Sequence, residues 1–229
     1  MRKTLQIIFM LIGLTSCKGQ EVKGVWMSYK NRVIEEGKVT TSRDEGIIID
    51  FDKQTVGNIS SDSLVDVKID FKESKIFLNS DTLNIDFKTF GKDSIQIDFG
   101  RNMMHVFRPL NLEHKLTTDK ENIIEFLTLN EFKEINENLS LKFLKRLHFY
   151  ATIFDRKNDK RFLESQIDTN GYWFIKELKG NFFLIFAVEE IGEQNIYQIT
   201  EFTKCKMELE LMQEYGEWIN NLTELKTCL

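Results

Sequence analysis

The sequence predicts an all-β protein made of antiparallel strands. Hydrophobic and polar residues alternate in several short runs, which places one face of each strand toward a core and the other toward water. These runs are residues 65–71, 83–87 and 95–99. Short turn-forming segments punctuate the region at residues 72–74, 79–81 and 91–93. Because such connections leave no room for crossover helices, we expect consecutive strands to pair as hairpins in a meander.

Residues 1–16 have the features of a secretory signal peptide. Arg2 and Lys3 give a positive start, and residues 5–14 form an apolar core interrupted only by Gln6. This core is too short to cross a bilayer of about 30 Å as a helix, but it has the length of a signal-peptide core. The alternative is a cytoplasmic N-terminal helix. The charge, the core length and the cysteine that follows together favour the signal peptide.

Leu14-Thr15-Ser16-Cys17 resembles the lipobox of bacterial lipoproteins, in particular those of Bacteroidetes. The resemblance implies cleavage before Cys17, which becomes the mature N-terminus and carries acyl chains such as palmitate, with residues 17–21 as a lipidated linker. Two or more acyl chains attach a protein stably to a membrane, whereas one attaches it only marginally. No Asp follows Cys17, so the resemblance also implies an outer-membrane location in the cell envelope, on either its periplasmic or its surface face.

Composition limits the partners. The 229 residues are 41% hydrophobic and 29% charged, which is enough apolar material for a buried core. The formal net charge is -5 and no stretch is densely basic, so the sequence argues against nucleic acid as a partner.

Cys205 and Cys228 remain once Cys17 is lipidated. In an oxidising compartment two such cysteines favour a pair, and closing a loop of about 22 residues would stabilise the fold by about 3 kcal/mol. A zinc or redox site would need a tighter cluster such as CxxC with histidine. We therefore expect a structural disulfide.

Residues 22–108 form the first predicted domain. Gly24-Val25-Trp26 near its start and Arg108 at its end resemble the lipocalin-like superfamily of β-barrels. The resemblance implies that Trp26 packs under an up-and-down barrel and that Arg108 covers it through cation–π stacking. It also implies an interior that could hold a ligand, lined by inward-facing apolar residues. The candidates are Val67, Ile69, Leu83, Ile85, Phe87, Ile97 and Phe99.

Residues 109–117 break the alternation and are the predicted linker to a second domain, residues 118–229. Thr118 to Glu121 has capping-box spacing, which predicts a short helix before strands resume near residue 131. Lys179-Gly180-Asn181 predicts a tight hairpin, and residues 182–186 are apolar on both faces, as in a central strand covered on both sides. Phe132 stands where a second lipocalin-like module would have its tryptophan, so we expect two small barrels in tandem.

No recognisable enzyme or metal motif is present. His105, His114 and His148 lie far apart, and the sequence contains no HExxH, GxSxG or phosphate-loop pattern. A calcium loop starting at Asp50 fails, because Thr55 replaces its glycine and Ser61 its glutamate. The tripeptide Ile-Asp-Phe recurs at residues 49–51, 69–71, 85–87 and 97–99. Its outward aspartates could form a calcium ladder or, more simply, the solvated face of the sheet. We expect no catalytic site, cofactor or metal.

Ser63, Thr82 and Ser94 each follow an aspartate and precede an aliphatic residue. This pattern resembles the O-glycosylation site of Bacteroidetes secreted proteins. Side-chain hydrogen bonds in turns that lead into strands explain all three placements and are the favoured interpretation.

Two functional classes fit these residues. The first is a lipid-anchored interaction or structural module of the cell envelope with no catalytic site. The alternative is a lipocalin-like binder of a hydrophobic small molecule or lipid. A filled barrel interior would favour the first and an open cavity the second.

Overall fold

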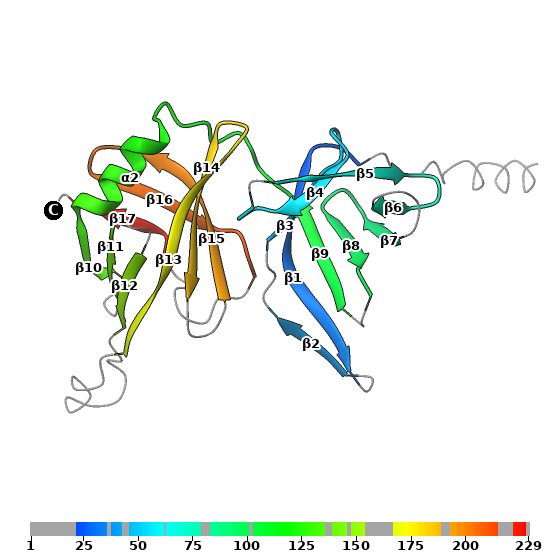
Figure 1. The fold of residues 1–229 in the computed structure, drawn as a ribbon, viewed down its shortest axis with the longest axis horizontal. Helices are drawn as coiled ribbons and strands as arrows, with labels where there is room; N and C mark the ends of the chain where they lie inside the picture. The colour runs from blue at the N-terminus through cyan, green and yellow to red at the C-terminus, as the bar shows by residue number, and fades with distance from the viewer. Residues whose placement is uncertain are drawn as a thin grey trace, which may run out of the picture.

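A computed structural model describes residues 22–35, 38–42, 46–61, 63–78, 83–100, 103–135, 139–145, 148–153, 167–188, 193–214 and 222–227. Within these ranges the chain forms two antiparallel sheets and one helix, arranged side by side (Figure 1). The prediction of an all-β fold with hairpin-connected strands is therefore confirmed.

The N-terminal sheet contains nine strands. They are β1 (Val25–Glu35), β2 (Lys38–Ser42), β3 (Ile47–Asp50), β4 (Thr55–Asn58), β5 (Val65–Asp70), β6 (Lys75–Leu78), β7 (Leu83–Phe90), β8 (Ser94–Asp98) and β9 (Met103–Pro109). Pairing of β9 with β1 closes all of them except β2 into a barrel. β2 pairs with the second half of β1, and the two project as an arm at the lower edge in Figure 1.

The recurring Ile-Asp-Phe tripeptide is largely a turn-capping device. Asp50, Asp70 and Asp98 each accept backbone N–H groups two or three residues further on, at 2.8–3.2 Å. The Ile and Phe on either side point into the barrel, as alternation along a strand requires. Asp86, within β7, is simply exposed. Asp50 differs from the predicted solvated face, since it is only 6% exposed.

The C-terminal sheet follows helix α2 (Lys120–Leu129). Its strands, hydrogen-bonded in chain order, are β10 (Glu131–Ile135), β11 (Leu139–Phe143), β12 (His148–Ile153), β13 (Ile167–Leu178), β14 (Asn181–Val188), β15 (Glu193–Phe202), β16 (Lys206–Leu211) and β17 (Glu224–Lys226). The sheet curls until β10 approaches β17, and α2 packs Ile123, Phe126 and Leu127 against its core. The predicted helix is confirmed, and its N-cap is Asp119, whose side chain accepts the Asn122 N–H at 2.8 Å.

β14 is covered on both faces, as predicted. Phe182, Leu184 and Phe186 point into the core of the C-terminal sheet. Phe183 and Ile185 point the other way and pack against the outside of the N-terminal barrel. This second cluster also contains Val25, Met27, Ile48, Ile59, Leu110, Ile196 and Met212. The apolar pattern of β14 thus arises because it separates two cores.

Polar contacts surround this apolar interface. The Asp50 carboxylate pairs with Lys179 Nζ (2.9 Å), and Lys176 Nζ donates to the Ser61 carbonyl (2.7 Å). Burial of Asp50 disfavours its charge, but Lys179 and the N–H groups of the following turn outweigh that effect and lower its pKa. The Glu214 N–H donates to the Tyr29 carbonyl (3.0 Å). The two sheets are therefore joined by a packed core with a hydrogen-bonded edge.

Candidate functional site

The residues expected to line the barrel lie together in its interior. Val67, Ile69, Ile85, Phe87 and Ile97 are all buried in one cluster, and Phe99 packs against it. The side chain of Leu83 lies outside the described residues.

Aromatic rings occupy the centre of this interior. Phe51 contacts three other rings: its centroid lies 6.2 Å from that of Trp26, 6.1 Å from that of Phe71 and 6.3 Å from that of Phe87. Such edge-on and tilted contacts are the preferred packing of aromatic side chains. Phe51, Trp26, Phe71 and Phe87 therefore form a contacting aromatic cluster within the barrel.

The role expected for Arg108 was wrong. Arg108 pairs with Met27 in the β1–β9 ladder and therefore lies on the outer face, whereas Trp26 points inward. Its guanidinium lies 5.5 Å from the Tyr29 ring centroid and donates to the Met212 carbonyl (3.1 Å). Arg108 thus links the barrel to the C-terminal sheet, and Trp26 is a core residue whose Nε1–H donates to the Lys23 carbonyl.

The predicted disulfide has a partial structural account. Cys205 is disulfide-bonded, but Cys228 lies outside the described residues, so their pairing stays a prediction. The Thr227 N–H does donate to the Cys205 carbonyl (2.9 Å), which brings the residue before Cys228 close.

Among the predicted glycosylation sites, Ser63 is exposed and its N–H donates to Ser61 Oγ (3.2 Å). Ser94 begins β8 half-buried, and Thr82 lies outside the described residues, as does the expected lipidation site Cys17.

The histidines are not brought together. His105 is buried and its ring meets Phe99 edge-on at 4.9 Å, which is the packing of a core histidine. His114 lies in the linker, 3.2 Å from the Asn111 amide, and the His148 side chain is outside the described residues.

The described residues include a pocket of about 490 Å³ between α2 and the turn that joins β15 to β16, which we call the α2 groove. One wall is a helical stripe made by Asn122, Glu125 and Leu129, which are spaced three and four residues apart. Phe126 and Phe202 both line the groove, and their rings are in edge-on contact with centroids 5.4 Å apart. The remaining lining residues are Thr118, Asn130, Thr203 and Lys204.

The chemistry of the α2 groove is amphipathic. Leu129 is 65% exposed, although it is a large hydrophobic residue on a helix that buries its opposite side. Exposed Glu125 and Lys204 give the groove one charge of each sign, and Asn122 adds an exposed amide. The groove can therefore take an apolar side chain against Leu129 and beside the Phe126–Phe202 pair, while polar groups around it accept and donate hydrogen bonds.

Sequence reasoning did not find this groove. Its two walls lie more than seventy positions apart and meet only because the sheet curls. The one local signal is Leu129, an apolar residue that continues an otherwise polar helical stripe.

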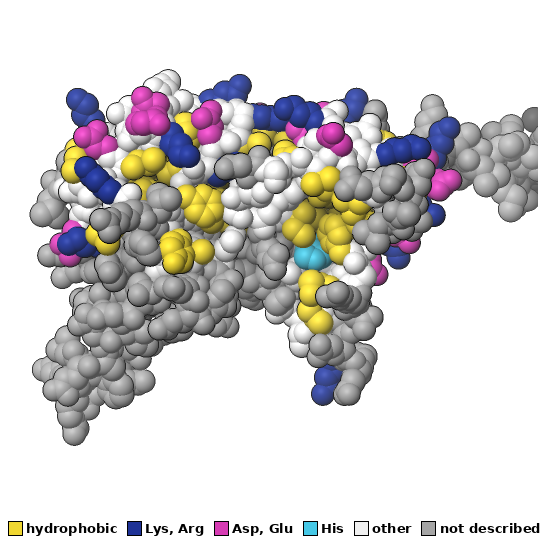
Figure 2. Space-filling view, in the orientation of Figure 1, with side chains coloured by type: hydrophobic (Ala, Val, Ile, Leu, Met, Phe, Trp, Pro, Cys, Tyr) yellow, Lys and Arg dark blue, Asp and Glu magenta, His cyan; other side chains and the backbone are white. Residues whose placement is uncertain are grey.

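Elsewhere on the surface, charges of both signs are mixed. Figure 2 shows Lys and Arg side chains interspersed with Asp and Glu along one edge, with hydrophobic side chains between them. Across the described part of the chain, no three His, Cys, Asp or Glu side chains are grouped as a metal would require. No helix in that part is long and apolar enough to cross a membrane.

Comparison with known proteins gives no matching family model, no matching curated protein and no matching solved structure.

Proposed function

We propose that this chain is a lipid-anchored interaction module of the bacterial cell envelope, which binds a segment of a partner protein in the α2 groove. Cys17 supplies the anchor, and the two joined sheets form the rigid body that carries the groove. The main support for this proposal is that the apolar side chain of Leu129 is exposed beside the Phe126–Phe202 pair.

The packing of the barrel supports this interpretation over a lipocalin-like one. Phe51, Phe71 and Phe87 make mutual ring contacts inside the barrel, which supports a packed core as the role of this interior. A body stabilised in this way needs no ligand to fold, and it can hold a surface site in a fixed position.

The chemistry of the groove indicates the kind of segment. An apolar side chain would occupy the space beside Phe126 and Phe202. In the partner segment, a basic residue would pair with Glu125 and an acidic residue with Lys204. The exposed Asn122 amide could form a hydrogen bond with the backbone of that segment.

The test is co-purification from mildly solubilised envelopes of the native host. Leu129→Glu places a charge in the apolar part of the groove and should abolish recovery of the partner, whereas Leu129→Met should retain it. Tyr172→Ser, which changes an exposed large side chain on strand β13 away from the groove lining, is the matched control. Equal recovery with Leu129→Glu and Leu129→Met would refute the groove as the binding site.

A second candidate is an amphiphilic small molecule in the same groove, because about 490 Å³ lies within the usual size of small-molecule sites. Native mass spectrometry of the protein extracted from its host tests this directly. A bound mass that disappears in Leu129→Trp, which fills the groove, would favour the small molecule.

A further inference from the structure

The end of the N-terminal barrel where the described chain begins is bordered by three hairpin turns. These are residues 51–54, 71–74 and 91–93, and together with Lys23 and Gly24 we call them the N-terminal rim. The Gly24 N–H donates to Asp52 Oδ1 (3.1 Å), and the Gly24 carbonyl accepts the Phe51 N–H (3.0 Å). These bonds fix the start of the chain against the first turn.

The other two turns are held at the same end. Phe71 packs on Phe51, and the Phe87 N–H donates to the Ser74 carbonyl (2.9 Å). The β8–β9 and β1–β9 ladders bring the 91–93 turn level with Pro109, which pairs with Trp26.

The length of the tether limits how far this rim can lie from a membrane. This step rests on the proposed lipidation of Cys17. Val22 is buried in the barrel, so the chain is fixed from that residue on. The five-residue step from Cys17 to Val22 spans at most about 18 Å even when fully extended. The far end of β1, at Glu35, lies about 33 Å from Val25 along the strand.

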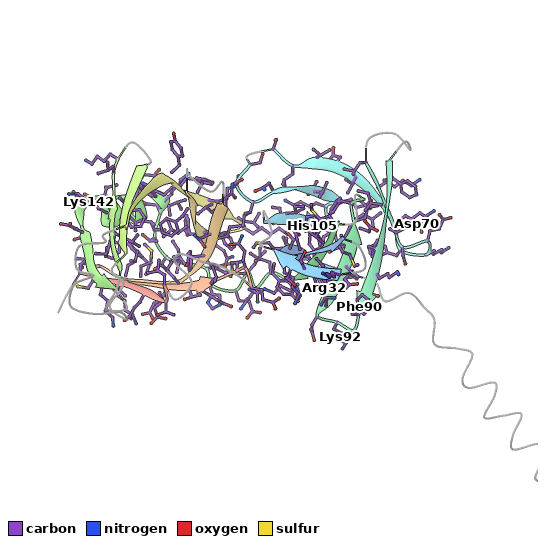
Figure 3. All side chains as sticks on the ribbon, turned by 90° about the horizontal axis from the view of Figure 1, so that it is seen from below. Arg32, Asp70, Phe90, Lys92, His105 and Lys142 are labelled. Atoms are coloured by element: carbon purple, nitrogen blue, oxygen red, sulfur yellow. The ribbon has the colours of Figure 1, made fainter. Side chains whose placement is uncertain are left out.

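The rim also has side chains suited to a lipid headgroup layer. Phe90, at the end of β7, is 51% exposed, and Phe90 and Lys92 project from the same corner of the barrel (Figure 3). The exposed lysines of the rim are Lys23, Lys53, Lys72 and Lys92. Asp52, Glu73 and Asp93 of the rim, together with Asp70 immediately before the second turn, balance them. An exposed aromatic ring among balanced charges suits the interface between headgroups and acyl chains.

We propose that the N-terminal rim is a membrane-contacting face, with Phe90 in the headgroup layer and the β1–β2 arm pointing away from the lipid. Because the rim charges balance, this contact depends little on anionic lipid. Figure 1 shows α2 along the same edge of the molecule as β5, opposite the arm, so a segment bound in the α2 groove would also lie near the lipid surface.

The experiment uses the lipidated protein from its host, reconstituted in phosphatidylcholine vesicles with and without phosphatidylglycerol. Single cysteines are introduced by Lys72→Cys, Lys92→Cys and, on the arm, Thr41→Cys, all at exposed positions. Each is labelled with a fluorophore, and quenching by lipids with nitroxide-labelled headgroups is measured. The unsubstituted protein controls for labelling of native cysteines.

We expect quenching at positions 72 and 92 to be several-fold stronger than at position 41, and nearly the same in both lipid mixtures. Equal quenching at all three, or stronger quenching at 41, would overturn the proposed orientation. Flotation of the vesicles separates this failure from failure of the anchor: protein that does not float is not lipid-anchored, whereas protein that floats with an unquenched rim is anchored but oriented differently.

Discussion

Gly46 offers a direct test of how the two sheets are joined. It has a φ of +74°, and a Cβ placed there would lie 2.3 Å from Ile196 Cδ1 and 3.0 Å from Ile59 Cγ2. Ile196 is fully buried at the interface, so it has little room to move away. Gly46→Ala should therefore cost about 1–2 kcal/mol for the left-handed backbone and a further ~1–3 kcal/mol for overpacking.

Gly91→Ala separates these two contributions. Gly91 has a similar φ of +66°, but nothing lies within 4 Å of the place that its Cβ would take, so only the backbone cost applies. Urea unfolding of both variants should show Gly46→Ala to be less stable by about 1–3 kcal/mol. Adding Ile196→Val, which removes Cδ1, should recover much of this difference. Equal stability of the two alanine variants would refute the packing of Ile196 over Gly46.

Other single features of the fold can be tested in the same way. Asp119→Ala should lower the free energy of unfolding by about 1 kcal/mol through loss of the α2 N-cap, and a larger effect of Thr118→Ala would reverse that assignment. Lys179 and the N–H groups of the following turn lower the pKa of Asp50. The ionised Asp50 carboxylate should therefore stabilise the fold fully above the ordinary Asp pKa of about 3.9, and this stabilisation should be lost as the pH falls through the lowered pKa. In Lys179→Met, the free energy of unfolding, measured by urea titration at several pH values, should fall less steeply with decreasing pH. An unchanged dependence of this free energy on pH would contradict the role of the ion pair. Asn195 is fully buried, and within the described structure neither polar atom of its carboxamide has a hydrogen-bond partner, so Asn195→Leu should raise stability by about 1–3 kcal/mol. A loss of stability would contradict the unpaired state of this amide. Finally, Cys17→Ser should abolish incorporation of an alkyne-tagged palmitate, and an unlabelled parent protein would contradict lipidation.

Local chemistry explains why much of the fold could be predicted. The hairpin at Lys179 and Gly180 depends on two consecutive residues with positive φ (51° and 78°), which the turn sequence itself favours. The doubly apolar pattern of residues 182–186 required cover on both faces, and the two clusters around β14 provide it. In these places the information lies within a few adjacent residues.

What could not be predicted depends on contacts between distant segments. Arg108 reaches the Met212 carbonyl, 104 positions further along the chain, and nothing near Arg108 in the sequence indicates that partner. Arg108 lies on the outer face because it pairs with Met27 in the β1–β9 ladder. A short sequence motif does not specify the register of that ladder. Asp50 has the sequence pattern of a solvated residue in an alternating strand, yet it is buried because Lys179 arrives from the other sheet.

The α2 groove is unpredictable for the same reason. Its helical wall and its turn are brought together by the curvature of an eight-stranded sheet. The sequence does contain Leu129, but an isolated exposed leucine is common on protein surfaces and indicates a site only once Phe202 is known to lie opposite.

Partner binding in the α2 groove can be tested most directly by photo-crosslinking in living cells of the native host, with a photoreactive amino acid in place of Leu129. We expect a discrete crosslinked product that is absent when the same group replaces Tyr172. Identical products from both positions, or none from position 129, would contradict the α2 groove as the site at which this module binds its partner.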